Sequence, residues 1–418
     1  VGSAQPTVAD DEKIVVSCDA VYSRGYYSNS TDDDFSIAFV RVVYKDYHLQ
    51  ELMFNLMYSP INTYCYSIDK KATKIFHEQM QNLSKCFSNV YISMDEYNVD
   101  SAGRNIDRSY LDCLKIVRKL PDWKYAIVLQ SIRQRCEDRS SSSSFLSENN
   151  STSYIQNHDI PLKTNREMIM ILKALNGSNN IELVPPFQSR IPKFDDWSFR
   201  ALSLFRGPGR ELLQNSRSSS RAIRKHSRHA NDLSESKEND NRTLNIGKGS
   251  TGAALSRSFV EFVVDKLNLT TLLQRFDTVG LGCDEMLLPS LNSEDALDAP
   301  GGYTRKCLHA NVSFITRYVV WVWSRLPCYS RRFRHYVCIF GIGDLKHLRE
   351  SRYLFGNKMM PEIDYGVISC WAKELHHRII QQQNHTVDLN YYSNLRTVIF
   401  NNFKQRWRSD MKAFNCTG

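Results

Sequence analysis

In the first third of the chain, segments with a hydrophobic pattern typical of strands alternate with segments whose hydrophobic residues recur at helical spacing. Continuous apolar runs typical of buried strands cover Phe35–Val43 and Thr63–Ile68. Between them, apolar residues recur at helical spacing from Leu49 to Met57, and Pro60 ends that pattern. The pattern therefore predicts a strand, an amphipathic helix and a second strand in succession.

The same alternation continues as far as residue 130. It predicts a helix over Lys70–Leu83, a strand over Val90–Ser93, a helix over Arg104–Leu120 and a strand over Trp123–Gln130. Strands joined by helices of about 12 residues predict right-handed crossovers and a mainly parallel sheet. We therefore expect an α/β protein with a Rossmann-like sheet flanked by helices, whose ligand binds beyond the carboxyl ends of the strands.

Two polar segments interrupt the pattern and are predicted to be loop insertions. They cover residues 131–156, with a serine run at Ser140–Ser144, and residues 216–242. Neither segment has enough apolar surface to order itself. Residues 1–34 are polar and turn-rich, like a stem, and residues 381–418 are largely polar. The expected organisation is a stem remnant, one folded domain over residues 35–380 and a C-terminal tail.

The positive charge of the chain is concentrated rather than spread over a folded face. The 418 residues carry a formal net charge of +9, with much of the excess in and just before the serine-rich segment from Ser216 to His229. That segment contains no Phe, Tyr or Trp on which bases could stack. It is typical of a solvated loop, and we expect no nucleic-acid partner.

The cysteines and glycosylation sequons favour an oxidising compartment. Eleven cysteines are many for a cytosolic enzyme, and none forms the Cys-x-x-Cys pair that suits zinc. Asn-x-Ser/Thr sequons begin, among others, at Asn29, Asn82, Asn150, Asn176, Asn268, Asn311 and Asn384. No apolar run approaches the roughly 20 residues that span a bilayer. Because the chain starts at Val1, we expect a membrane anchor upstream of it.

A glycine-opened loop offers a candidate phosphate site. A short apolar strand runs into Gly341 and Gly343 within Cys338–Leu345 (CIFGIGDL), and Lys358 follows in a Gly-Asn turn. Glycines let backbone approach a ligand closely, and a nearby lysine suits a diphosphate. An ordinary strand-to-helix turn would give the same pattern, so this stretch by itself is weak.

Asp284 and Glu285 open an apolar helical stretch and offer a candidate general base. Acidic residues are common at helix N-termini, where they cap the helix, so this reading competes with catalysis. Trp321 and Trp323 would point the same way in an extended segment. Such a pair suits a sugar ring, and core packing is the alternative.

These residues together resemble the core-2/I-branching β-1,6-N-acetylglucosaminyltransferases, whose wider family includes peptide O-xylosyltransferases. The resemblance runs from about Phe35 to Glu374 outside the two insertions. It rests on seven motifs in family order: Tyr64–Asp69, Ser84–Val90, Trp123–Tyr125, His158–Lys163 with Leu175–Gly177, Asp284–Glu285, Cys338–Leu345 and Asn357–Lys358.

The resemblance implies a GT-A-type glycosyltransferase fold that inverts the anomeric centre and needs no metal ion or other cofactor. Asp-x-Asp, the usual manganese signature of such folds, occurs only at Asp32–Asp34, before any predicted strand. Cations must then stabilise the departing diphosphate. The resemblance assigns Lys358 to that task. It places the family's arginine at His335, with Arg334 one residue away.

The resemblance also assigns the remaining site residues. Glu285 matches the catalytic base, and Asp284 is expected to orient its loop. Asp69 matches the aspartate that contacts uridine, and Trp321 and Trp323 fall on aromatic positions that contact the acceptor. Other acceptor contacts have no clear counterpart in residues 188–205.

Disulfide pairings follow from the same resemblance. It pairs Cys65 with Cys113, Cys18 with Cys86, and Cys328 with Cys338. It pairs Cys370 with a cysteine upstream of Val1, unless Cys416 takes that place. Cys283 and Cys307 flank the proposed base and could bridge, and Cys136 lies in the first insertion.

The expected function is transfer of GlcNAc from UDP-GlcNAc to the 6-hydroxyl of an O-glycan acceptor, by the lumenal part of a Golgi type II membrane protein. Two alternatives stay open. One is xylosyl transfer to protein. The other is a secreted binding protein that kept the fold and lost the activity, which the histidine at position 335 favours.

Overall fold

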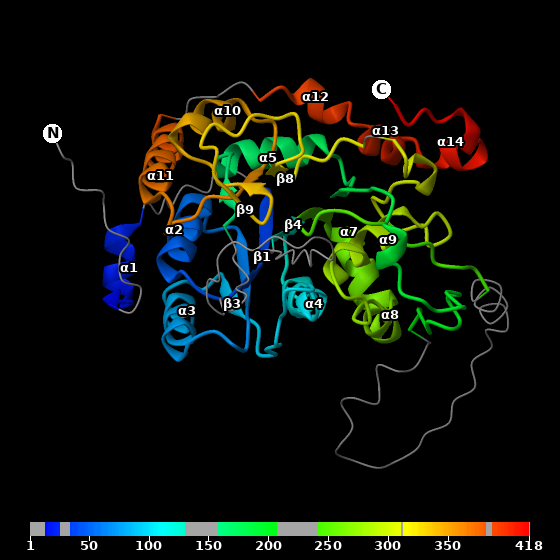
Figure 1. The fold of residues 1–418 in the computed structure, drawn as a ribbon, viewed down its shortest axis with the longest axis horizontal. Helices are drawn as coiled ribbons and strands as arrows, with labels where there is room; N and C mark the ends of the chain where they lie inside the picture. The colour runs from blue at the N-terminus through cyan, green and yellow to red at the C-terminus, as the bar shows by residue number, and fades with distance from the viewer. Residues whose placement is uncertain are drawn as a thin grey trace, which may run out of the picture.

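A computed structural model describes residues 13–25, 34–129, 158–206, 241–310, 312–381 and 387–417. The first predicted insertion lies outside these residues, as does nearly all of the second. Figure 1 shows a central sheet covered by helices on both faces. No helix in the described part of the chain is long and apolar enough to cross a membrane.

The central sheet has six strands in the order β3-β2-β1-β4-β7-β6. Strands β1, β2, β3 and β4 are parallel, whereas β7 is antiparallel to both β4 and β6. Their bounds are β1 (Ser36–Val43), β2 (Thr63–Ile68), β3 (Val90–Ile92), β4 (Trp123–Leu129), β6 (Asn180–Ile181) and β7 (Ala253–Ser256). The predicted mainly parallel α/β fold is therefore confirmed.

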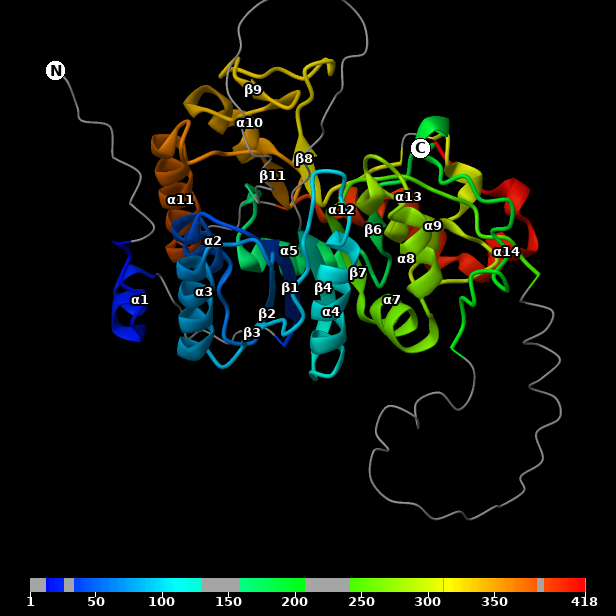
Figure 2. The ribbon, with the colours of Figure 1, turned by 60° about the horizontal axis from the view of Figure 1, so that its bottom comes forward.

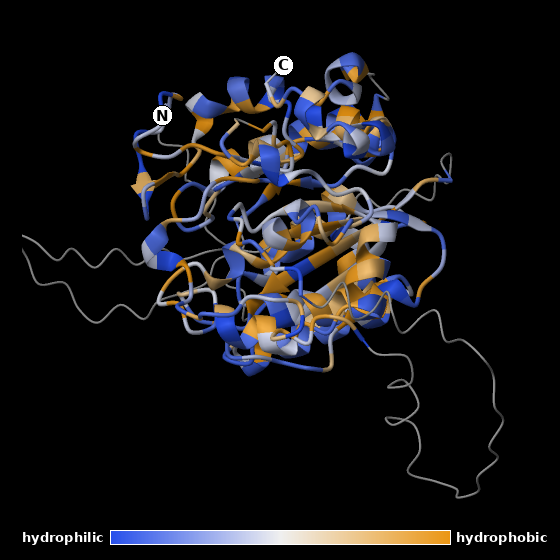
Figure 3. Cartoon of the chain, turned by 90° about the vertical axis from the view of Figure 1, so that its right-hand side faces the viewer, coloured by the Kyte–Doolittle hydropathy of each residue, from blue (hydrophilic) through white to orange (hydrophobic). Residues whose placement is uncertain are grey.

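Each face of the sheet has its own hydrophobic core. Along β1, Ile37 and Phe39 enter one core, and Ala38 and Val40 enter the other, because successive side chains point to opposite faces. The first core packs under α2 (Tyr47–Met57), α3 (Lys74–Cys86), α5 (Asn165–Ala174) and α11 (Tyr365–Ile380). The second packs under α4 (Ile106–Arg118), α7 (Arg257–Glu261), α8 (Thr270–Phe276) and α9 (Leu287–Ser293). Apolar residues accordingly gather on the inner strands in Figure 3.

Two smaller sheets stand beside the main one. The first has the order β5-β11-β8 and contains β5 (Ile160–Pro161), β8 (Arg317–Val319) and β11 (Phe355–Asn357). The second is the hairpin of β9 (Phe333–Arg334) and β10 (Val337–Cys338). In Figures 1 and 2, β8, β9 and α10 (Leu345–Glu350) lie together on one side, above β1. The two smaller sheets, with the residues that directly follow their strands, carry most of the residues that were predicted to bind the donor.

The polar C-terminal segment is helical and packed. It contains α12 (Leu389–Ser393), α13 (Arg396–Asn402) and α14 (Lys404–Ser409). Phe400 and Phe414 enter a third core with Tyr303. A disulfide between Cys307 and Cys416, 109 residues apart, ties this segment to the domain.

The predicted disulfides Cys18–Cys86, Cys65–Cys113 and Cys328–Cys338 are all present. Two further suggestions, Cys370–Cys416 and Cys283–Cys307, were wrong, whereas the pairing of Cys370 with a cysteine upstream of Val1 stays a prediction. Cys416 pairs with Cys307 rather than with Cys370, because the C-terminal helices carry it into the third core. Cys283 therefore has no bridge to Cys307, and its thiol instead donates to the carbonyl of Val279 at 3.3 Å. Within the described residues, Cys283 is a buried thiol and Cys370 an exposed one.

We expect Cys416→Ser to lower the free energy of unfolding by about 2–5 kcal/mol. Opening a loop of 109 residues gives the unfolded chain much more conformational entropy. Chemical denaturation followed by tryptophan fluorescence measures the change. Cys370→Ser, which removes an exposed thiol outside any bridge, is the matched control and should leave stability unchanged. Equal stability of both variants would contradict a structural role for the bridge.

Candidate functional site

Glu285 lies in the tight turn Cys283–Glu285 that leads into α9. Gly282 precedes this turn with φ +73°, and a Cβ added there would lie 3.0 Å from Glu285 Oε2. Glycine is therefore needed at this position both for the backbone angle and for the close approach of the carboxylate. The Glu285 side chain is only 6% exposed. The fold holds this carboxylate in one place.

Two cations bind one oxygen of the Glu285 carboxylate. Arg190 Nη1 donates to Oε2 at 3.1 Å, and Lys248 Nζ lies 2.9 Å from the same atom. The other oxygen, Oε1, has no hydrogen bond or ion pair to any residue that the structure describes. A substrate hydroxyl can therefore approach Oε1 while Oε2 stays anchored.

Sequence reasoning missed Arg190 and Lys248. Arg190 lies in the stretch where no acceptor contact was recognised, and Lys248 follows the second insertion. Both are brought to Glu285 by chain folding, from 95 and 37 positions away. A further acid, Glu182, lies in the field of Lys248 and Glu285, and burial raises its pKa. Two basic residues isolated in a polar stretch were the only sequence signal.

Asp284 points into the protein rather than toward solvent. Both of its carboxylate oxygens are buried, without a hydrogen-bond partner among the described residues. Burial, reinforced by Glu285 and Asp107, raises the pKa of Asp284 well above its usual value. Its side chain packs against Gly103, where an added Cβ would lie 2.0 Å from Oδ1. Asp284 is thus a packed acid that underlies the turn.

Lys358 follows β11 and is buried among charged side chains, at 7% exposure. Burial, together with the nearby cations Arg317 and Arg334, lowers the pKa of Lys358 to about 8, against the opposing effect of Asp159 and Glu362. Its ammonium forms no hydrogen bond or ion pair within residues 158–206, 241–310 or the other described ranges. This ammonium therefore lacks an anionic partner of its own.

Arg317 connects the Lys358 region to the Glu285 region. Its Nε donates to Asp159 Oδ1 at 2.6 Å, and its Nη1 donates to Thr251 Oγ1 at 3.1 Å. Thr251 lies three residues after Lys248, which binds Glu285. An extended chain covers at most about 3.6 Å per residue, so the Cα atoms of Lys248 and Thr251 are within roughly 11 Å. Arg317 therefore links the segment that carries Lys248, the partner of Glu285, to Asp159 and the Lys358 region.

The β9–β10 hairpin places Arg334 near Lys358. Arg334 Nη1 forms an ion pair with Glu362 at 3.0 Å and lies in the field of Lys358. His335 and Tyr336 form the tip of the hairpin with φ values of +51° and +62°. Arg334, one of the two neighbours predicted for the arginine position, is in electrostatic contact with Lys358.

Trp321 and Trp323, which an extended segment was expected to point the same way, stack on each other. Their ring centroids are 5.1 Å apart and their planes differ by 10°. Tyr336 of the hairpin tip extends the stack, at 5.7 Å from Trp323. Trp323 is 64% exposed, so it contributes little to a core. The three rings form an open aromatic surface beside Arg334.

Asp69 lies where β2 ends, at the carboxyl edge of the parallel strands. Its backbone N–H donates to the carbonyl of Val43 at 2.9 Å, which closes the end of β1. The side chain is buried and accepts the N–H of Lys71 at 2.9 Å. Burial raises the pKa of Asp69, and Lys71 partly offsets this. Asp69 shares the edge with the Lys358 region without a direct contact to Lys358.

The glycines of Cys338–Leu345 pack against the chain itself. A Cβ on Gly341 would lie 3.1 Å from Ser330 Cβ, and one on Gly343 would lie 3.0 Å from Tyr329 Cβ. Asp344 accepts the N–H groups of Tyr329, Ser330 and Gly341. These glycines therefore let the loop backbone pack closely against residues 329–330 of the same chain.

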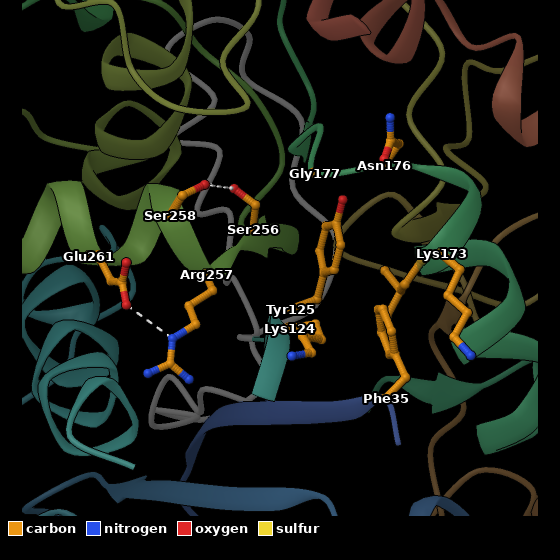
Figure 4. Close-up of a pocket in the computed structure, with 11 residues that line it drawn as sticks. Phe35, Lys124, Tyr125, Lys173, Asn176, Gly177, Ser256, Arg257, Ser258 and Glu261 are labelled. Carbon is orange, nitrogen blue, oxygen red and sulfur yellow. Dashed lines mark hydrogen bonds and ion pairs between the residues drawn. The ribbon is translucent and has the colours of Figure 1, made fainter. Parts of the chain in front are cut away.

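A cavity of about 530 Å³ lies at the amino-terminal ends of β1 and β4 (Figure 4). Phe35, Tyr125 and Arg257 line it, and Figure 4 shows Arg257 turned toward Glu261. It contains none of the predicted site residues. Among the described residues, no group of three or more His, Cys, Asp or Glu side chains is arranged to hold a metal ion.

Comparisons with known proteins point to one family. The Core-2/I-Branching enzyme family profile matches residues 37–132 and 138–349. The chain is 27% identical over 362 residues to the zebrafish (Danio rerio) beta-1,3-galactosyl-O-glycosyl-glycoprotein beta-1,6-N-acetylglucosaminyltransferase 4, covering 84% of this chain and 73% of that protein. It is 25% identical to enzyme 3 of that name from Ovis aries, over 83% and 69% of the two chains. It is also 25% identical to the probable human (Homo sapiens) enzyme 7, over 85% and 71%.

Proposed function

Because the chain belongs to the Core-2/I-branching enzyme family and is a glycosyltransferase, we propose that it transfers GlcNAc from UDP-GlcNAc to the 6-hydroxyl of an O-glycan acceptor. The transfer inverts the anomeric centre and uses no metal ion. The relatives' names, which specify β-1,6 transfer of N-acetylglucosamine, support this donor and linkage. The buried positive charges of the site also support a donor that carries a negatively charged diphosphate.

The observation that carries the proposal is an excess of buried positive charge. Among the described residues, Arg41, Arg317 and Lys358 lie in the field of one shared carboxylate, Asp159. Glu182 and Glu362 also face the cations Lys248 and Arg334, so positive charge stays in excess in this part of the structure. Buried charges are costly unless they are paired. The diphosphate of a nucleotide-sugar carries about two negative charges, so it neutralises this cluster. The neighbouring pair Arg334–Glu362 balances itself.

Glu285 acts as the general base in this mechanism. Its Oε1 removes the proton of the acceptor 6-hydroxyl as that oxygen bonds to C1 of the sugar. The bond between C1 and the β-phosphate oxygen breaks at the same time, and UDP departs with the electron pair. Because attack and departure occur on opposite faces of C1, the product has the inverted configuration. Arg190 and Lys248 keep the carboxylate in position through Oε2.

Lys358 and Arg334 stabilise the negative charge that grows on the departing diphosphate. Preorganised cations in a largely buried site do this without a metal ion. His335 is not needed for this task, because Arg334 already lies in the field of Lys358. Asp69 contacts the uridine at the carboxyl edge of the sheet. The stacked rings of Trp321 and Trp323 bind a sugar of the acceptor by its apolar face.

The proposed location is the lumen of the Golgi. Four disulfide bonds in the described residues favour an oxidising compartment. UDP-sugars and O-glycan acceptors meet in such a compartment. Immunofluorescence of the full-length protein against Golgi markers tests this location.

The direct test is to incubate the purified protein with UDP-GlcNAc and a Gal-β-1,3-GalNAc acceptor in the presence of EDTA. We expect a trisaccharide whose new linkage is β-1,6 by NMR, in undiminished yield with EDTA present. Parallel reactions contain UDP-xylose with a serine peptide. Transfer of xylose alone would replace the proposal with xylosyl transfer. Binding of UDP without transfer of either sugar would identify a binding protein, and dependence on manganese would contradict the metal-free mechanism.

A further inference from the structure

A single arginine interrupts the apolar strand β1. Arg41 lies opposite Tyr66 in the β1–β2 register, in the middle of the central sheet. Its side chain is 1% exposed, and its strand neighbours Val40 and Val42 are fully apolar. A charged group is rare in such a place unless it has a function or a partner. The arginine therefore needs an explanation.

Arg41 has no hydrogen-bond partner in the described part of the chain. Its Nε, Nη1 and Nη2 are all buried without one. Arg378 offers a direct comparison, because it is also buried, at 4% exposure, yet donates to both carboxylate oxygens of Glu167 and to the carbonyl of Leu162. Arg378 Nε has no described partner, but Nη1 and Nη2 of Arg378 both have acceptors, whereas no guanidinium nitrogen of Arg41 has one.

The groups nearest Arg41 are also unsatisfied. Asp159 lies in its field and has one oxygen, Oδ1, bound to Arg317, whereas Oδ2 has no hydrogen-bond partner among the described residues. The hydroxyl of Tyr66 is likewise buried without a described partner. Burial raises the pKa of Tyr66 to about 12, so it stays neutral and adds no counter-charge. Two guanidinium groups therefore share one carboxylate.

Asp159 links Arg41 to the donor region. The same carboxylate lies in the field of Lys358, and its partner Arg317 reaches Thr251 beside the Glu285 region. A charge in a dry protein interior acts over several ångströms with little screening. Arg41 is thus linked through the shared carboxylate of Asp159 to Lys358, where the donor diphosphate is proposed to bind.

We propose that Arg41 is a positioning residue whose buried positive charge, exerted through Asp159, strengthens binding of the donor's diphosphate. This inference rests on the proposed function. Arg41 offsets the negative charge of Asp159, so that Arg317 and Lys358 keep their full attraction for the ligand. The unbound protein holds an uncompensated charge, and the nucleotide diphosphate supplies the counter-ion.

Replacement of Arg41 by methionine tests the proposal by separating binding from stability. We expect the Kd for UDP, measured by calorimetry, to rise about 10- to 100-fold, which is 1.4 kcal/mol per factor of ten. The Kd for uridine, which lacks phosphate, should stay unchanged in ligand-observed NMR. The melting temperature of the unbound protein should stay the same or rise, because removing an unpaired buried charge relieves a cost.

Two further variants complete the test. Arg41→Lys keeps the charge and should bind UDP within a few-fold of the parent. Arg378→Met removes a paired buried arginine, so it should lower the melting temperature and leave UDP affinity of the folded protein unchanged.

The proposal is overturned if Arg41→Met binds UDP like the parent, if it weakens uridine equally, or if it fails to fold. A parent protein that binds no UDP would instead remove the proposed function itself, so the two failures are distinguishable.

Discussion

Replacing Glu285 with glutamine is expected to reduce kcat by at least about 10²-fold, the usual scale for loss of general-base assistance. Glutamine keeps the size of the side chain but cannot accept the hydroxyl proton. The Kd for UDP should change little, because the cations of the Lys358 region are untouched. Initial rates with saturating UDP-GlcNAc and acceptor give kcat, and calorimetry gives the Kd for UDP.

Glu261→Gln is the matched control for this variant. Glu261 also pairs with an arginine, Arg257 at 3.0 Å, but lines the cavity at the opposite end of the strands. It should retain normal turnover. A Glu285→Gln enzyme that turns over at a near-normal rate would eliminate Glu285 as the base. A rate loss accompanied by an equal loss of UDP affinity would point to a role in the donor site instead.

Affinity for UDP is expected to fall as the pH rises above about 8. The pKa of Lys358 lies at about 8, chiefly because the residue is buried. The ammonium is therefore present below this pH and lost above it. A binding reaction that requires one proton weakens by up to about tenfold for each further pH unit. Calorimetric titrations with UDP from pH 6.5 to pH 9.5 measure the effect.

Lys358→Ala should weaken UDP binding and kcat together by about 10²-fold at pH 7, because one cation serves both the bound diphosphate and the transition state. It should also abolish the fall in affinity above pH 8, since the ammonium that loses its proton near this pH is then absent. Unchanged affinity of the parent enzyme across this range, or rescue of the variant by manganese, would contradict the role given to Lys358.

Hydrophobic periodicity alone located the core of the fold. The run Phe35–Val43 became β1, Thr63–Ile68 became β2, and the helical spacing from Leu49 to Met57 became the inner face of α2. Helix boundaries were less accurate, since Lys70–Leu83 became Lys74–Cys86 after a Thr73 cap. Hydrophobic periodicity reports which side chains are buried. A strand buried on both faces gives a continuous apolar run, whereas a helix buried on one face gives apolar residues at helical spacing. This signal is local, and one sequence contains it.

The family resemblance placed three disulfides correctly and did not identify the fourth, Cys307–Cys416. Cys307 and Cys416 meet because the polar C-terminal segment folds back as helices and buries Phe400 and Phe414. The spacing of the cysteines carries no information about that return. A disulfide requires two Cα atoms within about 7 Å, which only the path of the chain decides.

The sequence by itself determined the α/β architecture and the identity of the acid and lysine candidates, because burial patterns and motifs are properties of short segments. Only the tertiary structure decided the surroundings of those candidates. Arg190 and Lys248 anchor Glu285 from separate parts of the chain, and Arg41 shares Asp159 with Arg317 although 276 positions separate the two arginines. Electrostatic interactions depend on distance in space, and a linear pattern does not contain that distance.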